Sequence, residues 1–288
     1  MKDFLRRIWY KLSGKKKQPA YHEIMGLDDE AIIAFKSQAW QGSELVGHYS
    51  KTVEHHFFDN VTIKLFMHYL KPGYKVLDVG AGTGRLTFPV ADMGCHVTAT
   101  DISAEMLAEI EKNKGNRVVE TVKASAESLP FADETFDAVV QADFLIHFPN
   151  WRALLTEQLR VCKPGAPIVF TMVNADNLHT FEGGRVAGIA YLSGGGYYAS
   201  CTREELELFA SENGAEVVRI HPYRLFTNSY GETLLTPKEH AELNRLIYKA
   251  CQDQRVMVAV SRLELEIVSV LPEDATAMAV MAIRKLPL

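Results

Sequence analysis

The segment Val76-Leu77-Asp78-Val79-Gly80-Ala81-Gly82-Thr83-Gly84 places three glycines directly after a short apolar run. The run has the length and the branched side chains of a buried β-strand, and the residues after the glycines are typical of a helix. A glycine turn between a strand and a helix lets the backbone approach a ligand closely and points helix N-terminal amides at it. The segment therefore predicts a nucleotide-like ligand, with a tight structural turn as the less favoured alternative.

Strand-like and helix-like segments alternate on both sides of this turn. The strand-like segments cover residues 75–79, 96–100, 118–123, 136–141 and 167–173, and the helix-like ones cover residues 85–93, 104–113 and 151–161. Such alternation predicts a parallel sheet. We expect an α/β fold, Rossmann-like and doubly wound, with a mostly parallel seven-stranded sheet that has an antiparallel edge strand.

Further along the chain, two capping boxes mark helix starts. Thr202-Arg203-Glu204-Glu205 opens a helix that Gly214 can close, and a strand should follow at residues 216–220. Thr236-Pro237-Lys238-Glu239 has proline at its first helical position, and its helix should run toward Cys251. The segments 262–270 and 275–284 are predicted to be strands that form a hairpin at the sheet edge.

Three parts are expected along the chain. A basic amphipathic arm covers residues 1–20, an N-terminal helical lid covers residues 21–72, and Lys71-Pro72-Gly73 then stops the helical pattern. The core domain follows at residues 73–288. It holds a substrate-lid insertion at about residues 174–201, where glycine pairs occur beside Tyr197 and Tyr198.

The first 17 residues differ in charge from the rest of the chain. The net charge of −5 divides into +6 on residues 1–17 and −11 elsewhere. Phe4, Leu5, Ile8 and Trp9 recur there at helical spacing, which suits peripheral contact with the anionic inner surface of a membrane. A solvated tail is the alternative. Because lysines interrupt the apolar residues, the segment is not a secretory signal, and we expect a cytoplasmic protein.

Metal binding is not expected. The four cysteines are scattered without a C-x-x-C pair, which gives neither a disulfide framework nor a cysteine zinc site. His55 and His56 are adjacent, so they would point in different directions on a helix.

Asp101 ends the second strand-like segment, 21 positions after Gly80. An acidic residue about 20 positions after the first glycine holds ribose hydroxyls in dinucleotide-binding folds. A helix cap, shared with Ser103, is the other role that this position allows. The glycine spacing is G-x-G-x-G rather than the G-x-G-x-x-G of nicotinamide-binding proteins, which favours a different cofactor.

With these motifs, residues 75–220 resemble the class I S-adenosylmethionine-dependent methyltransferases, particularly the group that includes ubiquinone and menaquinone biosynthesis methyltransferases. The resemblance implies S-adenosylmethionine as cofactor and an in-line methyl transfer. It implies that the aminoacyl part of the cofactor contacts the turn, that Asp101 holds the ribose, and that Ile102 and Met106 lie beside the adenine. The implied turn contacts are Asp78, Gly80, Ala81, Gly82 and Gly84.

A second family motif is altered here. The segment Ala124-Ser125-Ala126-Glu127-Ser128-Leu129-Pro130-Phe131 resembles a G-D-A-E-x-L-P-F-like motif, with Ser125 in place of the usual aspartate. The resemblance implies adenine contacts from Ser125, Ala126 and Glu127. It also places Gln141, at the end of the fourth strand, against the cofactor.

His147 is the candidate general base. It follows the fourth strand, where this family brings substrate to cofactor, and imidazole titrates near neutral pH. The alternative is a histidine that packs beneath the turn at residues 148–150.

These features favour a methyltransferase that acts on a small molecule such as a lipid, a quinone or a lipid-linked glycan. Methylation of transfer RNA or another nucleic acid is an alternative, and the acidic charge outside the arm disfavours it. A catalytically idle, cofactor-binding regulatory protein is a third interpretation.

Overall fold

The computed structural model describes residues 53–177, 185, 186, 188–191, 197–224 and 237–287. The basic arm, most of the predicted helical lid and part of the predicted insertion lie outside these residues. The membrane contact expected of residues 1–17 therefore lies outside the described residues. The side chains of His55 and His56 also lie outside the described part of the chain. Within the described part of the chain, no helix is long and apolar enough to span a bilayer.

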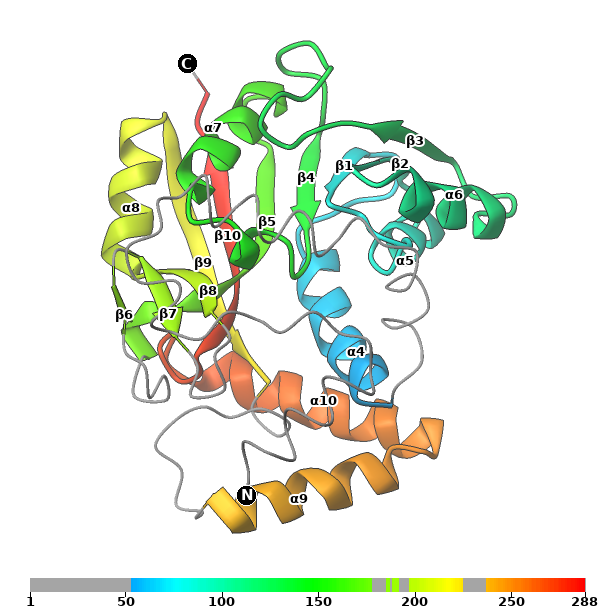
Figure 1. Ribbon diagram of the computed structural model, residues 1–288, viewed down its shortest axis with the longest axis vertical. Helices are drawn as coiled ribbons and strands as arrows, with labels where there is room; N and C mark the ends of the chain where they lie inside the picture. Colours follow the sequence, from blue (N-terminus) through cyan, green and yellow to red (C-terminus); the bar gives the residue numbers. More distant parts are fainter. Residues whose placement is uncertain (1–52, 178–184, 187, 192–196, 225–236, 288) are drawn as a thin grey trace, which may run out of the picture.

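Five parallel strands form the centre of the fold (Figure 1). Along the sheet they follow the order β3-β2-β1-β4-β5. Their bounds are β1 Lys75–Val79, β2 His96–Asp101, β3 Val119–Lys123, β4 Ala138–Gln141 and β5 Pro167–Asn174. Because β1 lies between β2 and β4, the strand order reverses at β1, and open α/β sheets bind ligands at such a switch point.

Two long strands complete the main sheet. β10 (Met278–Lys285) pairs antiparallel with both β5 and β9 (Ala215–Tyr223). The expected α/β sheet with an antiparallel strand is confirmed. However, the antiparallel strand lies one position inside the edge, because β9 covers its outer side.

The predicted C-terminal hairpin is wrong. Residues 262–270 belong to helix α10 (Gln254–Val270), which packs against α4 (Val53–Met67) and β9 (Figure 1). Leu263, Leu265 and Ile267 alternate with polar residues, which favoured a strand. The buried residues of α10 are instead Ser261, Glu264 and Val268, and this spacing of three and four residues has the helical period.

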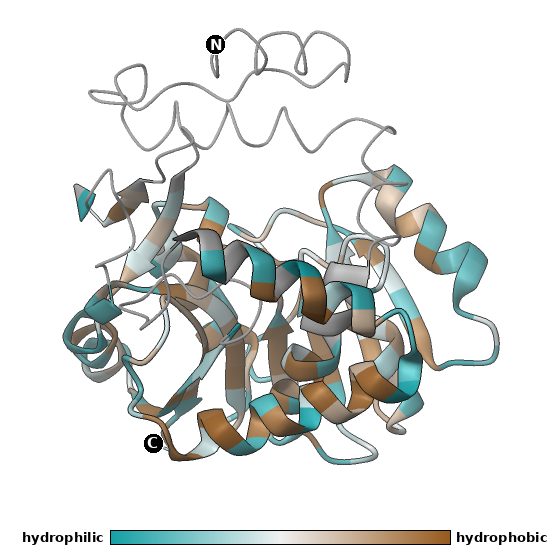
Figure 2. Ribbon diagram, turned by 90° about the horizontal axis from the view of Figure 1, so that it is seen from below, coloured by the Kyte–Doolittle hydropathy of each residue, from teal (hydrophilic) through white to brown (hydrophobic). Residues whose placement is uncertain are grey.

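The remaining helices agree with the sequence pattern. α5 is Thr87–Asp92, α6 is Ala104–Asn113, α7 is Trp151–Val161, α8 is Arg203–Glu212 and α9 is Pro237–Ala250. The capping box of α8 is present, with the Thr202 hydroxyl accepting from the Glu205 amide. Figure 2 shows hydrophobic residues along the strands and on the helices that cover them. Burial of these two surfaces against each other drives the assembly of the layers.

The insertion after β5 contains three short strands in its described part. β6 (Arg185–Val186), β7 (Ile189–Tyr191) and β8 (Tyr197–Cys201) form an antiparallel meander. β8 also pairs with the last two residues of β5. Arg185 ties the meander to α8 through an ion pair of 2.5 Å with Glu205.

Candidate cofactor and acceptor site

The glycine turn follows β1 at the carboxyl edge of the sheet. Gly80, Gly82 and Gly84 all have positive φ, at 66°, 55° and 93°. The Ala81 amide donates to the Thr100 carbonyl at 2.9 Å, which fixes the turn beside the end of β2. A Cβ on Gly80 would lie 2.1 Å from the Phe144 ring, whereas a Cβ on Gly82 would meet nothing within 4 Å. Gly80 is therefore needed for packing, and Gly82 leaves an open surface for a ligand.

Asp101 faces this open surface from the end of β2. One carboxylate oxygen accepts from the Gly82 amide and the other from the Ser103 amide, each at 2.9 Å. Burial raises the pKa of Asp101, and these two amide hydrogen bonds oppose the rise. The Ser103 hydroxyl caps α6 by accepting from the Met106 amide. Capping thus rests on Ser103, while the Asp101 carboxylate is held in place with lone pairs left for two hydroxyl donors.

Asp78 lies within β1 and is almost completely buried. Its carboxylate accepts a 2.6 Å hydrogen bond from the hydroxyl of Thr87, the first residue of α5. Burial raises its pKa to about 7, and the Thr87 hydrogen bond and the Arg85 charge partly offset that rise. Asp78 therefore joins β1 to α5 behind the glycine turn, a role that the sequence did not indicate for Thr87.

We expect the cofactor-free protein to lose stability as pH rises from about 4 to about 7, because the pKa of Asp78 is raised over this range. The folded state holds this proton more tightly than the unfolded chain does, so the stabilisation is complete at low pH and is lost as the carboxyl ionises. Asp78→Asn should abolish this loss. Urea denaturation should show the variant gaining about 2–3 kcal/mol relative to the wild type between pH 5 and pH 8.

A second variant tests the assignment. Thr87→Val removes a hydrogen bond that lowers the pKa of Asp78, so the loss of stability should move to higher pH. A difference between Asp78→Asn and the wild type that stays constant with pH would contradict the buried titration.

The predicted adenine contacts differ in exposure. Ile102 is 47% exposed beside Asp101, so its apolar side chain is available to pack against a flat ring such as adenine. Met106 is 6% exposed, so little of its side chain is available to a ligand. An adenine contact thus suits Ile102 better than Met106.

The segment after β3 lies next to Asp101, because the Ala124 amide donates to the Asp101 carbonyl at 3.1 Å. Ser125 and Glu127 are exposed there and Ala126 is half-buried. The Ser125 hydroxyl accepts from the Glu127 amide at 3.3 Å, which leaves its proton for another acceptor. The adenine contacts expected of these residues remain a prediction, with geometry that allows them.

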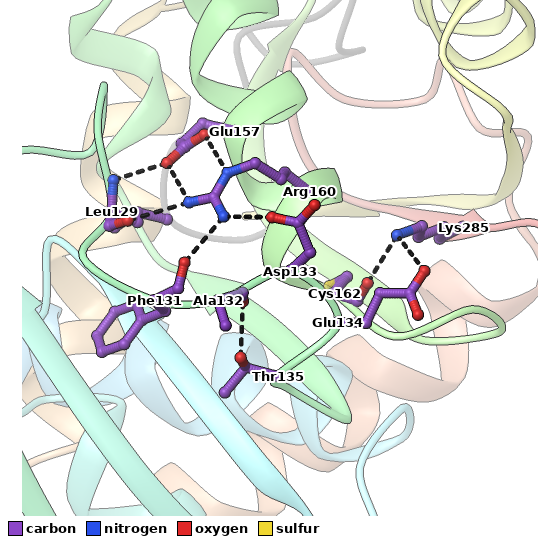
Figure 3. Close-up of polar contacts among 10 residues, drawn as sticks. All are labelled: Leu129, Phe131, Ala132, Asp133, Glu134, Thr135, Glu157, Arg160, Cys162 and Lys285. Atoms are coloured by element: carbon purple, nitrogen blue, oxygen red, sulfur yellow. Dashed lines mark hydrogen bonds and ion pairs between the residues drawn. The ribbon is translucent and has the colours of Figure 1, made fainter.

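Arg160 of α7 holds the far end of this segment (Figure 3). Its guanidinium donates to the carbonyls of Leu129 and Phe131 at 3.0 and 2.8 Å. The same group forms ion pairs of 2.7 Å with Asp133 and Glu157, and Glu157 also accepts from the Leu129 amide. The Arg160 side chain thus fixes the backbone at the end of residues 124–131, which we call the adenine loop.

We expect Arg160→Ala to lower the free energy of unfolding by about 1–3 kcal/mol, because two carbonyls and the buried part of Glu157 lose a charged donor. Affinity for S-adenosylhomocysteine should fall as well, since the adenine loop loses its anchor. Denaturation, ligand titration and hydrogen exchange of residues 124–131 would measure these effects.

Arg117→Ala is the matched control. Arg117 forms a bidentate pair with the exposed Asp92 and donates to the carbonyls of Asn113 and Lys114, so its contacts lie outside residues 124–131. Equal effects of the two substitutions on hydrogen exchange of residues 124–131 would contradict the anchoring role of Arg160.

The Gln141 side chain packs toward α7. It is buried, and its amide nitrogen donates to Gln158 of α7 at 3.0 Å. Because side chains alternate between the faces of a strand, the end of β4 directs Gln141 toward α7. The cofactor contact expected at Gln141 remains a prediction, for which its backbone at the end of β4 is available.

An ionic cluster that the sequence did not reveal follows β4. Asp143 pairs with Arg85 at 2.9 Å and with Arg224 at 3.5 Å, and the two arginine charges hold the pKa of its carboxyl well below the usual range. Asp143 and Arg224 both have positive φ, at 52° and 66°. Strained backbone of this kind concentrates at functional sites. The only hint in the sequence was the position of Arg85, directly after Gly84.

His147 lies at the end of η2 (Leu145–His147), next to this cluster. Its side chain is half-buried, and its ring centroid is 6.0 Å from that of Tyr198 in β8. Its charge contributes to the lowered pKa of Asp143. The structure therefore brings His147 and Tyr198 together beyond the carboxyl end of β4, and the role of His147 as base remains a prediction.

Among the described residues, no three histidine, cysteine or acidic side chains are grouped so that they could hold a metal ion. The groups that do converge suit an adenosyl ligand. They are the open surface at Gly82, the paired carboxylate oxygens of Asp101 and the exposed Ile102.

Known proteins resemble this chain in the same region. A family model described as a methyltransferase domain matches residues 77–170. The chain is 37% identical over 99 residues to an uncharacterized protein of Mycobacterium tuberculosis, which covers 34% of this chain and 36% of that protein. It is 41% identical over 98 residues to demethylmenaquinone methyltransferase of Renibacterium salmoninarum, which covers 34% of this chain and 40% of that one. The match thus spans less than half the length of these relatives.

A solved structure extends the likeness to most of the fold. The S-adenosylmethionine-dependent methyltransferase of Mesorhizobium loti aligns with a TM-score of 0.52 and 14% identity, over 82% of this chain and 99% of that one. At this identity the likeness supports the fold, and the match at residues 77–170 supports the class. Residues 77–170 therefore form a methyltransferase domain, and the similarity to S-adenosylmethionine-dependent methyltransferases supports S-adenosylmethionine as the cofactor.

Proposed function

We propose that this chain transfers a methyl group from S-adenosylmethionine to a small-molecule acceptor. The observation that carries the proposal is the pairing of Gly82 with Asp101, which offers an open backbone surface and a fixed carboxylate inside the segment that matches the family. In this arrangement Asp101 receives the ribose hydroxyls, and the glycine turn receives the aminoacyl part.

An aromatic, quinol-like acceptor is the class that we propose first. The demethylmenaquinone methyltransferase of Renibacterium salmoninarum supports it by name. Locally, Phe144 and Phe148, which flank η2 and His147, lie with ring centroids 4.6 Å apart. Such rings favour a flat apolar acceptor. The basic, amphipathic residues 1–17 support an acceptor that resides in a membrane.

The bound cofactor supplies an electrophilic methyl group on a sulfonium. The protein's part is chiefly to hold the acceptor atom about 3–3.5 Å from that methyl carbon, in line with the bond that breaks. His147 accepts the proton of an acceptor hydroxyl, and Asp143 stabilises the imidazolium that results.

The test incubates the full chain with methyl-labelled S-adenosylmethionine and separate acceptors. The acceptors are a short-chain naphthoquinol, a short-chain benzoquinol, a bacterial lipid extract and unmodified transfer RNA. Label should enter a quinol with one S-adenosylhomocysteine formed per methyl transferred. Labelled transfer RNA would instead favour the nucleic-acid alternative. Tight cofactor binding without transfer to any acceptor would favour the idle regulatory protein.

With an active acceptor, His147→Gln should lower kcat by about 10²–10⁴-fold, because a general base contributes about that much. Cofactor affinity should not change, and the acid limb of the pH–rate profile should disappear. His96→Gln is the control, since His96 is exposed at the start of β2. An unchanged kcat in His147→Gln would contradict the role of His147 as general base and favour the alternative that its ring only packs in the fold.

A further inference from the structure

A cavity of about 890 Å³ is lined by residues from α4, α10, β9 and β10. Figure 1 shows where these elements lie in the fold. The cavity lies at the opposite end of the sheet from the glycine turn. Tyr74, just before β1, and Pro167, the first residue of β5, both line it, whereas the turn follows the last residue of β1. A ligand here would be about one strand length, roughly 16 Å, from the glycine turn.

Cations surround the opening of this cavity. They are Lys64 and Lys71 from α4 and the loop after it, Arg219 from β9 and Arg284 from β10. All four are exposed. Arg284 forms a 3.3 Å pair with Glu216, in which both side chains are almost half exposed. No carboxylate is among the described residues that line the cavity.

This concentration of positive charge contrasts with the chain as a whole, whose net charge is −5. Like charges that share a concave surface raise the local potential and attract anions. A singly charged carboxylate would neutralise one of the four cationic side chains. A phosphate or pyrophosphate carries more than one negative charge and can therefore pair with several of them.

The floor of the cavity is apolar and aromatic. Leu65 and Val268 are buried there, and Tyr69 and Tyr74 are half-buried. The Tyr69 hydroxyl lies 2.6 Å from Nε2 of His221, and burial lowers the pKa of His221 to about 4. The Tyr69–His221 pair is therefore neutral near pH 7, and the floor suits an apolar or aromatic body rather than a second charged group.

We propose that this cavity binds a phosphorylated small molecule, with its phosphate on the cations of the opening and its apolar or aromatic part on the floor. The volume lies within the range of about 300–1,000 Å³ that small-molecule sites occupy. The proposal is independent of the methyl-transfer function, because no residue that lines this cavity belongs to the cofactor or acceptor site.

The test uses calorimetry on the full chain, with the cofactor site saturated by S-adenosylhomocysteine. The probes are 1-naphthyl phosphate, pyrophosphate, soluble dihexanoyl phosphatidic acid and the uncharged 1-naphthol. We expect 1:1 binding of 1-naphthyl phosphate or of the short-chain phosphatidic acid, and whichever binds more tightly identifies a soluble or a lipid source of the phosphate. Pyrophosphate should bind more weakly, since it lacks the apolar part, and 1-naphthol should not bind.

Lys64→Ser combined with Lys71→Ser should weaken phosphate binding by about tenfold or more, because two charged donors are lost. Lys112→Ser combined with Lys249→Ser changes the net charge equally at exposed positions outside the cavity, and affinity should stay within about twofold. Equal losses in the two double variants, or no binding of any phosphorylated probe, would overturn the proposal. Unchanged binding of S-adenosylhomocysteine in all variants would show that the cofactor site is intact and separate.

Discussion

Replacing Asp101 with Asn should weaken binding of S-adenosylmethionine by about ten- to a hundredfold. Each hydroxyl that donates to an ionised carboxylate contributes about 1.5–3 kcal/mol, and an amide group offers only one acceptor oxygen. The Asn side chain must also present a donor to either the Gly82 or the Ser103 amide, both of which now donate to the carboxylate. Calorimetric titration would measure the loss.

The matched control for this substitution is Glu105→Gln. Glu105 is exposed four residues later and accepts from the Ser103 hydroxyl at 2.8 Å, so the charge change is the same and the location is close. Its affinity for the cofactor should remain within about twofold of the wild type, because exposed charges contribute little. Undiminished affinity in Asp101→Asn would contradict the assignment of Asp101 to the ribose hydroxyls, and it would not change the assignment of the fold.

The parts of the site that the sequence predicted are local in the chain. The glycine turn, the strand before it and Asp101 each follow from spacing and from residue types within about 25 positions. The capping box at Thr202 belongs to the same kind of signal, since its two hydrogen bonds join residues three apart.

The parts that the sequence did not predict depend on contacts between distant residues. Arg85 and Asp143 are 58 positions apart, and Arg224 reaches the cluster from the end of β9. Nothing in the neighbourhood of Asp143 identifies its two arginine partners. The cavity between α4 and β9 has the same origin, because Lys64, Arg219 and Arg284 become neighbours only after the sheet forms.

The short-range pattern was misleading at residues 262–270. Apolar and polar residues alternate in 262–270 over too few positions to distinguish a strand from a helix. The segment is helical, and it buries Glu264 and Val268, which are four residues apart. The Gln141 side chain hydrogen-bonds to Gln158 of α7, a contact that its place at the end of a strand did not indicate.

Gly80→Ala and Gly82→Ala should differ in the property that each reduces more, which is folding stability for the first and cofactor binding for the second. Both glycines have positive φ, which costs an alanine about 1–2 kcal/mol. At Gly80 the new Cβ also meets the Phe144 ring at 2.1 Å, so a further loss of about 1–3 kcal/mol from overpacking is expected. At Gly82 the Cβ enters open space and adds no clash.

Cofactor binding should separate the two variants. In Gly82→Ala the methyl group occupies the surface beside Asp101 that the cofactor needs, so affinity should fall more than about tenfold while the protein stays folded. In Gly80→Ala the denaturation midpoint should fall most, and any remaining folded protein should keep more of its affinity. Urea denaturation and titration with S-adenosylhomocysteine would measure both effects. Full affinity in Gly82→Ala would mean that the open surface at Gly82 does not contact the cofactor, and the ligand would then have to approach the turn from the side of Phe144.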